Sequence, residues 1–358
     1  MRQNKWELRG DLGAVMEVFR SFNLNFGPTP YRLSDLIAPQ FHQRFDVLFP
    51  ALSQTNTNTK TLVLSEQSTS MTLPTQQLRP GALVAGRYEI VSLICSGGMG
   101  VIYKAKHLLL DKFCAIKMLH HHRMHEKALQ RFEQEARATS KLTHPKLITV
   151  HDFGFSEDGH PFMVMDLIEG VSLSDFIGDR GGLGCEQAVN IFLQICDGMQ
   201  YAHEQGVLHR DLKPSNVMLA DVETQTPEAK VVDFGIAKID CGPDQTAVAV
   251  TQSGEILGSP LYMSPEQATG RHVDKRSDIY SMGCLMYETL TGRPPFKGDS
   301  TLETMIQHLR SEPPTLAEKS ACRSFPKELD VVMQKALAKD PDQRYQSMLA
   351  LRHDLLKC

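Results

Sequence analysis

The spacing of apolar positions changes along the chain and divides it into two structural halves. Three stretches that follow Pro80-Gly81 are short and β-rich: RYEIVSLI, VIYKAKHLL and KFCAIKML. Their close succession predicts an antiparallel sheet of three consecutive strands. HEKALQRFEQEARATSKL then consists largely of good helix formers and predicts a helix, and HPFMVMDLI predicts a further strand.

Beyond Ser172 the period becomes helical. Four stretches carry this signal: EQAVNIFLQICDGMQYAHEQG, DIYSMGCLMYETLTG, STLETMIQHLR and ELDVVMQKALAKD. We therefore predict an α+β chain with a small β-rich lobe at 86–170, which holds one helix, and a larger helical lobe at 171–358. A ligand cleft is expected between the two lobes.

The chain before residue 86 has two compositional parts. Residues 1–50 are rich in aromatic side chains, and one helical face of this part collects Leu12, Val15, Met16, Phe19 and Phe22. We predict one or two short helices there, either packed on the main domain or docking a partner protein. Residues 51–85 are rich in Ser, Thr and Gln and show no periodicity, which predicts a flexible linker.

Composition narrows the functional classes. With 358 residues, 41% hydrophobic and 22% charged, the chain is typical of a globular protein, and its net charge of −4 gives no attraction to nucleic acid. No apolar run approaches the length of a membrane span. The eight cysteines are scattered without C-x-x-C pairs, which favours reduced thiols and a cytoplasmic location. Nothing in the composition fixes the oligomeric state.

A glycine-rich loop lies in the stretch LICSGGMGVIYKA, residues 93–105. Cys95 stands where a G-x-G-x-x-G loop would have its first glycine, before Gly97 and Gly100. The loop lies between two predicted strands, which argues against a dinucleotide fingerprint, and it lacks the G-K-[ST] of a Walker loop. Two alternatives remain: a hairpin that folds over phosphates, or a plain tight hairpin.

Polar groups of a phosphoryl-transfer site follow along the chain. Lys117, in a predicted strand, needs an anion if buried, and Glu135 is a candidate partner, although both could be unrelated surface charges. HRDLKPSNVML supplies Asp211, Lys213 and Asn216, and a DFG begins at Asp233. Asp and Asn oxygens are ligands that Mg²⁺ prefers, and the co-occurrence of these groups predicts phosphoryl transfer.

With these motifs on the chain, a family resemblance emerges. From about Gly86 to Lys357 the chain resembles the catalytic domain of eukaryotic-type protein kinases. GGMGVIYKA, HPKL, YAHEQGVLHRDLKPSN, GSPLYMSPEQ and SDIYSMGCLMYETLTGRPPF are most similar to the bacterial serine/threonine branch. The resemblance implies a bilobal fold, ATP with Mg²⁺ or Mn²⁺, and phosphorylation of protein substrates in signal transduction.

The resemblance also implies residue roles. Lys117 would hold the α- and β-phosphates and pair with Glu135, Asp211 would accept the proton of the substrate hydroxyl, and Lys213 would contact the moving phosphoryl group. Asn216 and Asp233 would hold the metal. The implied nucleotide site consists of Ile94, Cys95, Ser96, Gly97, Gly98, Met99, Gly100, Val101, Ile102, Ala115, Lys117, Met165, Asp166, Leu167, Ile168 and Met218.

Specificity and regulation follow from the same resemblance. The L-K-P-S-N string is the serine/threonine form, and Ser259 matches a position whose hydroxyl meets the catalytic Asp and Lys. Arg210 resembles the arginine of kinases whose activation segment is ordered by phosphorylation. Thr251 and Ser253 match the usual phosphosites, so we expect autophosphorylation there.

Two structural contacts are also implied by the resemblance. Glu266 is expected to form an ion pair with Arg344 and so to fasten the end of the activation segment to the helical lobe. Asp278 is expected to accept hydrogen bonds from the backbone of the HRD loop.

Several alternatives remain open on the sequence alone. The chain could be a pseudokinase scaffold or a small-molecule kinase, although the complete set of polar groups disfavours the first and GSPLYMSPE the second. We expect Cys95 to weaken ATP affinity, and a redox role for its thiol is a minor alternative. His120, His121, His122 and His125 form either an exposed loop or a metal site.

Overall fold

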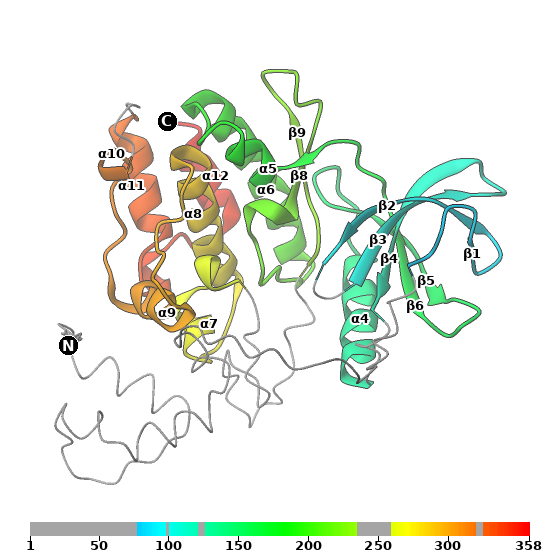
Figure 1. The fold of residues 1–358 in the computed structure, drawn as a ribbon. Coiled ribbons are helices and arrows are strands. Elements are labelled where there is room, and N and C mark those ends of the chain that lie inside the picture. Colours follow the sequence, from blue (N-terminus) through cyan, green and yellow to red (C-terminus); the bar gives the residue numbers. More distant parts are fainter. Residues whose placement is uncertain (1–76, 98–99, 121–125, 235–258, 320–324) are drawn as a thin grey trace, which may run out of the picture.

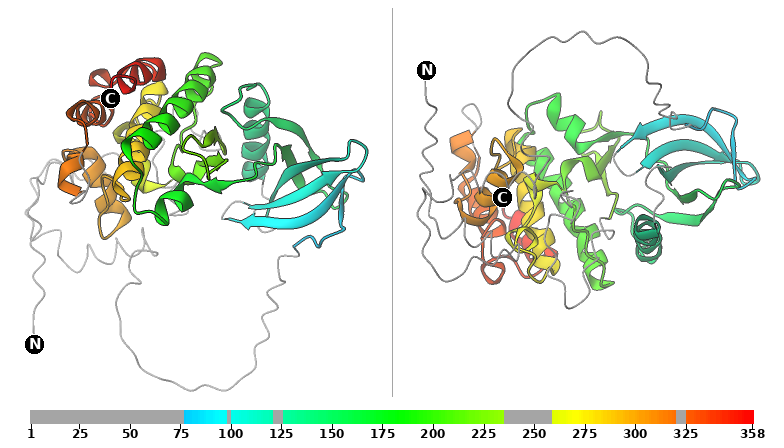
Figure 2. Two further views of the ribbon diagram at one scale, coloured as in Figure 1. Left: turned by 90° about the horizontal axis from the view of Figure 1, so that it is seen from above. Right: turned by 60° about the horizontal axis from the view of Figure 1, so that its bottom comes forward.

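The computed structural model describes residues 77–97, 100–120, 126–234, 259–319 and 325–358. Figure 1 shows a β-rich small lobe beside a helical large lobe, which confirms the predicted bilobal α+β architecture. Both views of Figure 2 show the same side-by-side arrangement. The predicted helices of residues 1–50 lie outside the described residues. No helix in the described ranges is long and apolar enough to cross a membrane.

The small lobe is built on a six-stranded antiparallel sheet in the order β1-β2-β3-β4-β6-β5. Its strands are β1 (Leu83–Val84), β2 (Tyr88–Ser96), β3 (Gly100–His107), β4 (Lys112–Leu119), β5 (Val150–Phe155) and β6 (Pro161–Met165). Four of them were predicted from their apolar, β-branched sequences. The sequence of β5, VHDFGF, mixes polar residues and glycine with its apolar positions, and for that reason its pattern gave no strand signal.

One boundary differs from the prediction. The linker was expected to continue to residue 85, but the small lobe begins earlier. Leu78, Ala82 and Ala85 pack against its core, and β1 pairs with β2. These apolar residues are too few to form a periodic pattern in the sequence, and the sheet edge supplies the partners that order them.

The helix of the small lobe is α4 (Glu126–Thr139), which lies beside the sheet (Figure 1). Phe132 and Ala136 of this helix pack on Leu119 and Met163 of strands β4 and β6. Glu135 therefore comes from the helix face that meets the sheet, where it is buried.

The large lobe contains a short sheet and most of the helices. Its strands are β7 (Val171–Ser172), β8 (Val217–Ala220) and β9 (Glu228–Val231), and its helices are α5 (Leu173–Gly178), α6 (Cys185–Glu204), α7 (Pro265–Ala268), α8 (Lys275–Thr291), α9 (Thr301–Arg310), α10 (Leu316–Lys319), α11 (Lys327–Ala336) and α12 (Met348–Leu355). The four predicted helices correspond to α6, α8, α9 and α11. Residues of α8 are buried on all sides from Ser277 to Tyr287, which makes it the central helix of the lobe.

The packing of α11 predicts a stability difference between two adjacent valines. The side chain of Val332 is 4% exposed and lies in the core, whereas Val331 is 66% exposed. Val332→Ala should lower the free energy of unfolding by about 2 kcal/mol relative to Val331→Ala, because it removes buried methyl groups and leaves a cavity. Helix propensity changes equally in both variants and cancels. Denaturant unfolding measures the difference, and equal losses would contradict the assignment of the core.

Candidate active site

A buried lysine joins the sheet, the helix α4 and the large lobe. Lys117 Nζ lies 2.9 Å from Glu135 Oε1 and 2.9 Å from Asp233 Oδ1. The side chains of Lys117 and Glu135 are only 10% and 7% exposed. The predicted pairing of Lys117 with Glu135 is therefore present, and the alternative of two unrelated surface charges is wrong.

The charges of this triad depend on one another. Burial alone lowers the pKa of the Lys117 amine, but the carboxylates of Asp233 and Glu135 outweigh it and raise that pKa. Burial raises the pKa of Glu135, and Lys117 opposes this shift. Burial also acts to raise the pKa of Asp233, but the charge of Lys117 outweighs it and holds that pKa below its usual value. The lysine is thus a cation that keeps Asp233 ionised.

The loop before β8 gathers the other predicted polar groups. Lys213 Nζ donates to Asp211 Oδ2 at 2.8 Å, and Asn216 Nδ2 donates to the Asp211 carbonyl at 2.9 Å. A single turn of 3₁₀ helix, Pro214–Asn216, places Asn216 back toward Asp211. The structure therefore brings Asp211, Lys213 and Asn216 together as the sequence predicted.

Two residues of the site have backbone angles that L-amino acids rarely adopt. Arg210 has φ of 64° and Asp233 has φ of 55°. Such strained residues persist only where surrounding contacts hold them, and they are frequent at functional sites.

Asp278 of α8 supports the strained loop. Its carboxylate accepts hydrogen bonds from the backbone N–H of His209 at 2.9 Å and of Arg210 at 2.8 Å, and from His203 Nε2 at 2.7 Å. Burial alone raises the pKa of Asp278, but the hydrogen bond from His203 outweighs it and lowers that pKa. The predicted contact of Asp278 with the HRD backbone is confirmed.

The residues around Asp233 are held by packing. Phe234 is buried in the large-lobe core, with its ring 4.8 Å from that of His209. His209 Nε2 in turn donates to the Val232 carbonyl at 3.1 Å. The residues on either side of Asp233 are therefore fixed, which directs its carboxylate to Lys117.

The donor set of the site fits a magnesium ion. Asn216 Oδ1 and Asp233 Oδ2 accept no hydrogen bond from the described residues, since Asn216 donates through Nδ2 and Asp233 meets Lys117 through Oδ1. Within the described residues no three His, Cys, Asp or Glu side chains form a metal-binding group. Mg²⁺ typically uses one or two carboxylates plus phosphates and water, and two free oxygens suit that demand.

An apolar cluster lies beside these polar groups. Ala115, Ile148 and Met165 are buried together, and Ile102, Leu167, Ile168 and Val232 pack against them. Five of these residues were predicted, whereas Ile148 and Val232 were not. For Val232 the sequence offered one signal, its place directly before Asp233. Ile148 is brought to the cluster by the fold, because its N–H donates to the Val231 carbonyl at 2.9 Å.

Three predicted pocket residues lie outside this apolar cluster. Ile94 is exposed and Met218 is half-buried on β8. Val101 packs into the core of the small lobe. Successive residues of a strand point to opposite faces, so Ile102 faces the apolar cluster and Val101 does not.

The segment after Met165 is anchored by its first side chain. The carboxylate of Asp166 lies 2.8 Å from His151 Nε2 and 3.4 Å from Lys230 Nζ. His151 belongs to β5 and Lys230 to β9, so Asp166 links the two lobes where the sequence predicted a hinge.

The glycine loop tolerates its cysteine. Cys95 is an exposed residue of β2, paired with Ile102, and its φ is not positive, so this position does not need glycine. A Cβ on Gly100 would come within 2.1 Å of the Met118 carbonyl oxygen, so glycine is required there for close approach to β4. Ser96 pairs with Val101 at the end of the hairpin, and the predicted residues Gly98 and Met99 lie outside the described residues.

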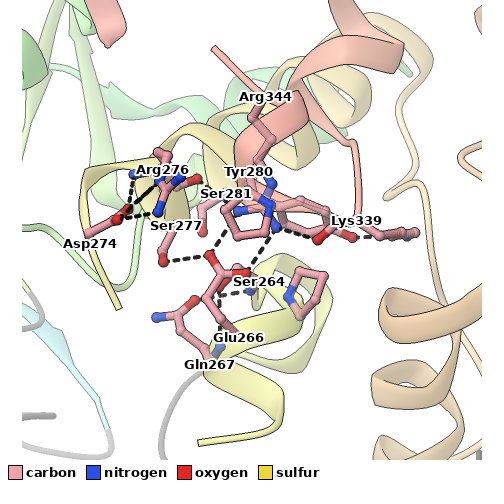
Figure 3. A network of polar contacts seen from close by, with 12 residues as sticks. Ser264, Glu266, Gln267, Asp274, Arg276, Ser277, Tyr280, Ser281, Lys339 and Arg344 are labelled. Carbon is pink, nitrogen blue, oxygen red and sulfur yellow. Dashed lines mark hydrogen bonds and ion pairs between the residues drawn. The ribbon is translucent and has the colours of Figure 1, made fainter. Parts of the chain in front are cut away.

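The end of the activation segment is fastened into the large lobe. Both carboxylate oxygens of Glu266 meet the buried guanidinium of Arg344, at 2.7 and 2.9 Å, and Ser277 Oγ donates to Glu266 at 2.6 Å (Figure 3). Burial alone raises the pKa of Glu266, but the hydrogen bonds and charge of Arg344 outweigh it and lower that pKa. The predicted ion pair is confirmed.

The helix α7 connects this ion pair to the catalytic loop. Ser264 caps α7 in a capping box with Gln267, and Gln267 Nε2 donates to the Arg210 carbonyl at 3.0 Å. Nearby, Tyr262 donates a 2.5 Å hydrogen bond to Glu288 of α8.

The regulatory residues are only partly described. Thr251 and Ser253 lie outside the described residues. The Ser259 hydroxyl forms no hydrogen bond with Asp211 or Lys213 in the part of the chain that the structure describes, so that contact stays a prediction.

Comparison with known proteins gives a consistent result. A family model of the protein kinase domain matches residues 88–356. The chain is 37% identical over 278 residues to serine/threonine-protein kinase PknB of Mycolicibacterium smegmatis, covering 76% of this chain and 43% of that protein. It is 38% identical over 276 residues to serine/threonine-protein kinase pkn3 of Myxococcus xanthus, covering 77% of this chain and 50% of that protein. The chain thus spans half or less of the length of these relatives.

A solved structure shows the same fold. The crystal structure of the PknI kinase domain of Mycobacterium tuberculosis matches with a TM-score of 0.61 and 25% identity. The match covers 78% of this chain and 99% of that one.

The buried ion pair of Glu266 predicts a large stability effect. Glu266→Gln should lower the free energy of unfolding by about 3–5 kcal/mol at pH 7, because it leaves the guanidinium of Arg344 buried without a counter-charge. Denaturant unfolding measures this loss.

Asp342→Asn is the matched control. It removes the exposed ion pair of Arg276 with Asp342 and should cost less than about 1 kcal/mol. Because the folded pKa of Glu266 is lowered, its stabilisation is complete above the unfolded pKa and declines as the pH falls through the folded value. Glu266→Gln should lack this share of the acid dependence. A loss no larger than that of Asp342→Asn would contradict the role of the pair.

Proposed function

The chain belongs to the protein kinase family, and we propose that it transfers the γ-phosphoryl group of ATP to serine and threonine hydroxyls of proteins. The observation that carries the proposal is the Lys117 triad with Glu135 and Asp233. The triad brings charged groups from the sheet, α4 and the large lobe to one place, and phosphoryl transfer requires such positioned charges.

Each group of the site has a role in this reaction. The apolar cluster around Ala115 and Met165 would take the adenine, and Lys117 would orient the phosphates. A metal ion held by Asn216 and Asp233 would neutralise phosphate charge when bound; we favour Mg²⁺, with Mn²⁺ as the alternative.

Asp211 and Lys213 would act on the transferred group. The Asp211 carboxylate accepts the proton of the substrate hydroxyl. The oxygen of that hydroxyl bonds to the γ-phosphorus, while the bond from the γ-phosphorus to the bridging oxygen of ADP breaks. Lys213, already 2.8 Å from Asp211, offers its ammonium group to the phosphoryl oxygens. Catalysis is then mostly positioning and charge neutralisation.

Specificity for serine and threonine in proteins has two supports. The catalytic loop carries Lys213-Pro214-Ser215-Asn216, and the relatives are named serine/threonine-protein kinases. The α7 network, which fixes the end of the activation segment beside the catalytic loop, suits a protein substrate better than a small molecule.

A pseudokinase scaffold is the competing class. It is disfavoured because Lys117, Glu135, Asp211, Asn216 and Asp233 are all present. Lys117 contacts Glu135 and Asp233, and Asn216 contacts Asp211. Cys95 does not favour it, because its position accommodates a side chain without backbone strain.

Regulation by phosphorylation is part of the proposal. Arg210 Nε is buried and has no hydrogen-bond partner among the described residues. Burial lowers the pKa of the Arg210 guanidinium. A phosphate on Thr251 or Ser253 would satisfy such a group, since arginine pairs strongly with phosphate.

The wider setting is also proposed. We infer a cytoplasmic reaction, since all six described cysteines are free thiols, and we propose that residues 1–50 dock a partner protein.

Asp211→Asn tests the reaction. With [γ-³²P]ATP, magnesium and a generic protein substrate, the variant should transfer phosphate about 10²–10⁴-fold more slowly than the parent, because it loses the proton acceptor. Asp179→Asn, which changes an exposed residue after α5, is the control and should retain the parent rate. An inactive parent protein, or an active Asp211→Asn variant, would refute the proposed function.

Autophosphorylation of the activation segment has its own test. Phosphopeptide mapping of the parent protein should find phosphate on Thr251 or Ser253, and the Asp211→Asn variant should carry none. Arg210→Gln should reduce the activity of the phosphorylated protein and leave that of the unphosphorylated protein little changed, because only the phosphate needs the guanidinium. A map of active parent protein without either site contradicts this mode of regulation.

A further inference from the structure

The hairpin that carries the glycine loop is held against the neighbouring strand. Gly100, the first residue of β3, pairs with Leu119, the last residue of β4. The Gly97 N–H donates to the Gly100 carbonyl at 2.9 Å and closes the hairpin. His120 directly follows Leu119, so the pairing register brings the imidazole beside the loop.

His120 makes a direct contact with the loop backbone. Its Nε2 lies 2.7 Å from the Gly97 carbonyl oxygen. Since a carbonyl only accepts, Nε2 must carry a proton and donate. A protonated Nε2 cannot bind a metal at that atom, so the contact offers a role for His120 other than the metal site considered from the sequence.

This hydrogen bond fixes the direction of the Gly97 carbonyl. Gly97 has no side chain, and a Cβ there would meet no atom within 4 Å, so packing does not fix it. Its N–H and its carbonyl are both occupied, one by Gly100 and one by His120. A carbonyl turned toward bound phosphates would face oxygens of like partial charge, and the bond to His120 holds it elsewhere.

We propose that His120 is a positioning residue that fixes the Gly97 carbonyl, and with it the end of the β2–β3 hairpin, in the position that favours ATP binding. The proposal rests on the proposed kinase function. Loss of the hydrogen bond should weaken ATP binding far more than it slows phosphoryl transfer, because Lys117 and Asp233 are held by their own ion pair and Asp211 by its contact with Lys213.

Cys95 supplies a reporter of loop position that needs no catalysis. It lies in the same hairpin, two residues before Gly97, and its thiol is free. Burial, and then the charge of Asp233, raise the pKa of the Cys95 thiol, whereas the charge of Lys117 lowers it. A hairpin end that moves away from the site relieves the burial, the largest of these effects, and should speed alkylation of the thiol. Cys185, half-buried on α6, is an internal reference in the same molecule.

The experiment compares His120→Ala, His120→Gln and His120→Asn in the full chain. The glutamine amide can place a donor where Nε2 lies, whereas asparagine is one carbon–carbon bond too short. Two quantities are measured: the KM for ATP with kcat, and the rate of Cys95 alkylation by iodoacetamide relative to Cys185, followed by peptide mass spectrometry without nucleotide.

We expect His120→Ala and His120→Asn to raise the KM for ATP about three- to tenfold, the factor that one ordinary hydrogen bond is worth, with kcat nearly unchanged. Both should speed Cys95 alkylation, and His120→Gln should restore both readouts. Unchanged alkylation in His120→Ala, or a loss of kcat that His120→Gln does not restore, overturns the proposal. If the parent protein transfers no phosphate, the kinase function fails, and the alkylation rates still decide whether His120 holds the loop.

Discussion

One buried ammonium group couples the parts of the molecule that would act on a phosphoryl donor. Lys117 comes from the sheet, Glu135 from α4 and Asp233 from the segment after β9, and each carboxylate lies 2.9 Å from the lysine. An unpaired buried charge in this place would cost several kcal/mol, so moving any one of the three elements away from the other two is unfavourable. The position of α4 on the sheet and the orientation of Asp233 are thereby linked through one side chain.

The two lobes serve the site in different ways. In the large lobe, Asp278 and Gln267 hold the strained backbone around Arg210 from two helices, so the groups that meet the acceptor hydroxyl stand on a rigid base. In the small lobe, the described ends of the glycine loop are held by strand pairing, by the Gly97–Gly100 hydrogen bond and by His120. The base of the site is thus fixed by side chains from two helices, whereas these loop ends are fixed mainly by backbone bonds of the sheet.

The sequence predicted the polar residues of the site well, because Lys117, Asp211 and Asp233 stand in motifs whose order along the chain is itself specific. It predicted the apolar cluster less well. Ile148 and Val232 join the apolar cluster through hydrogen bonds between distant backbone segments, which local composition does not reveal. The early start of the small lobe and the contact of His120 likewise depend on which strands pair, and pairing is a property of the fold.

The Glu266–Arg344 pair has a consequence for biosynthesis. Its partners are 78 positions apart, and between them lie α8 and the helices that pack around it. Closing so long a loop is slow and unfavourable until the intervening helices have packed. A chain emerging from the ribosome therefore cannot form this pair until Arg344 has been added, so the residues around Glu266 are fastened to the large lobe only late in synthesis.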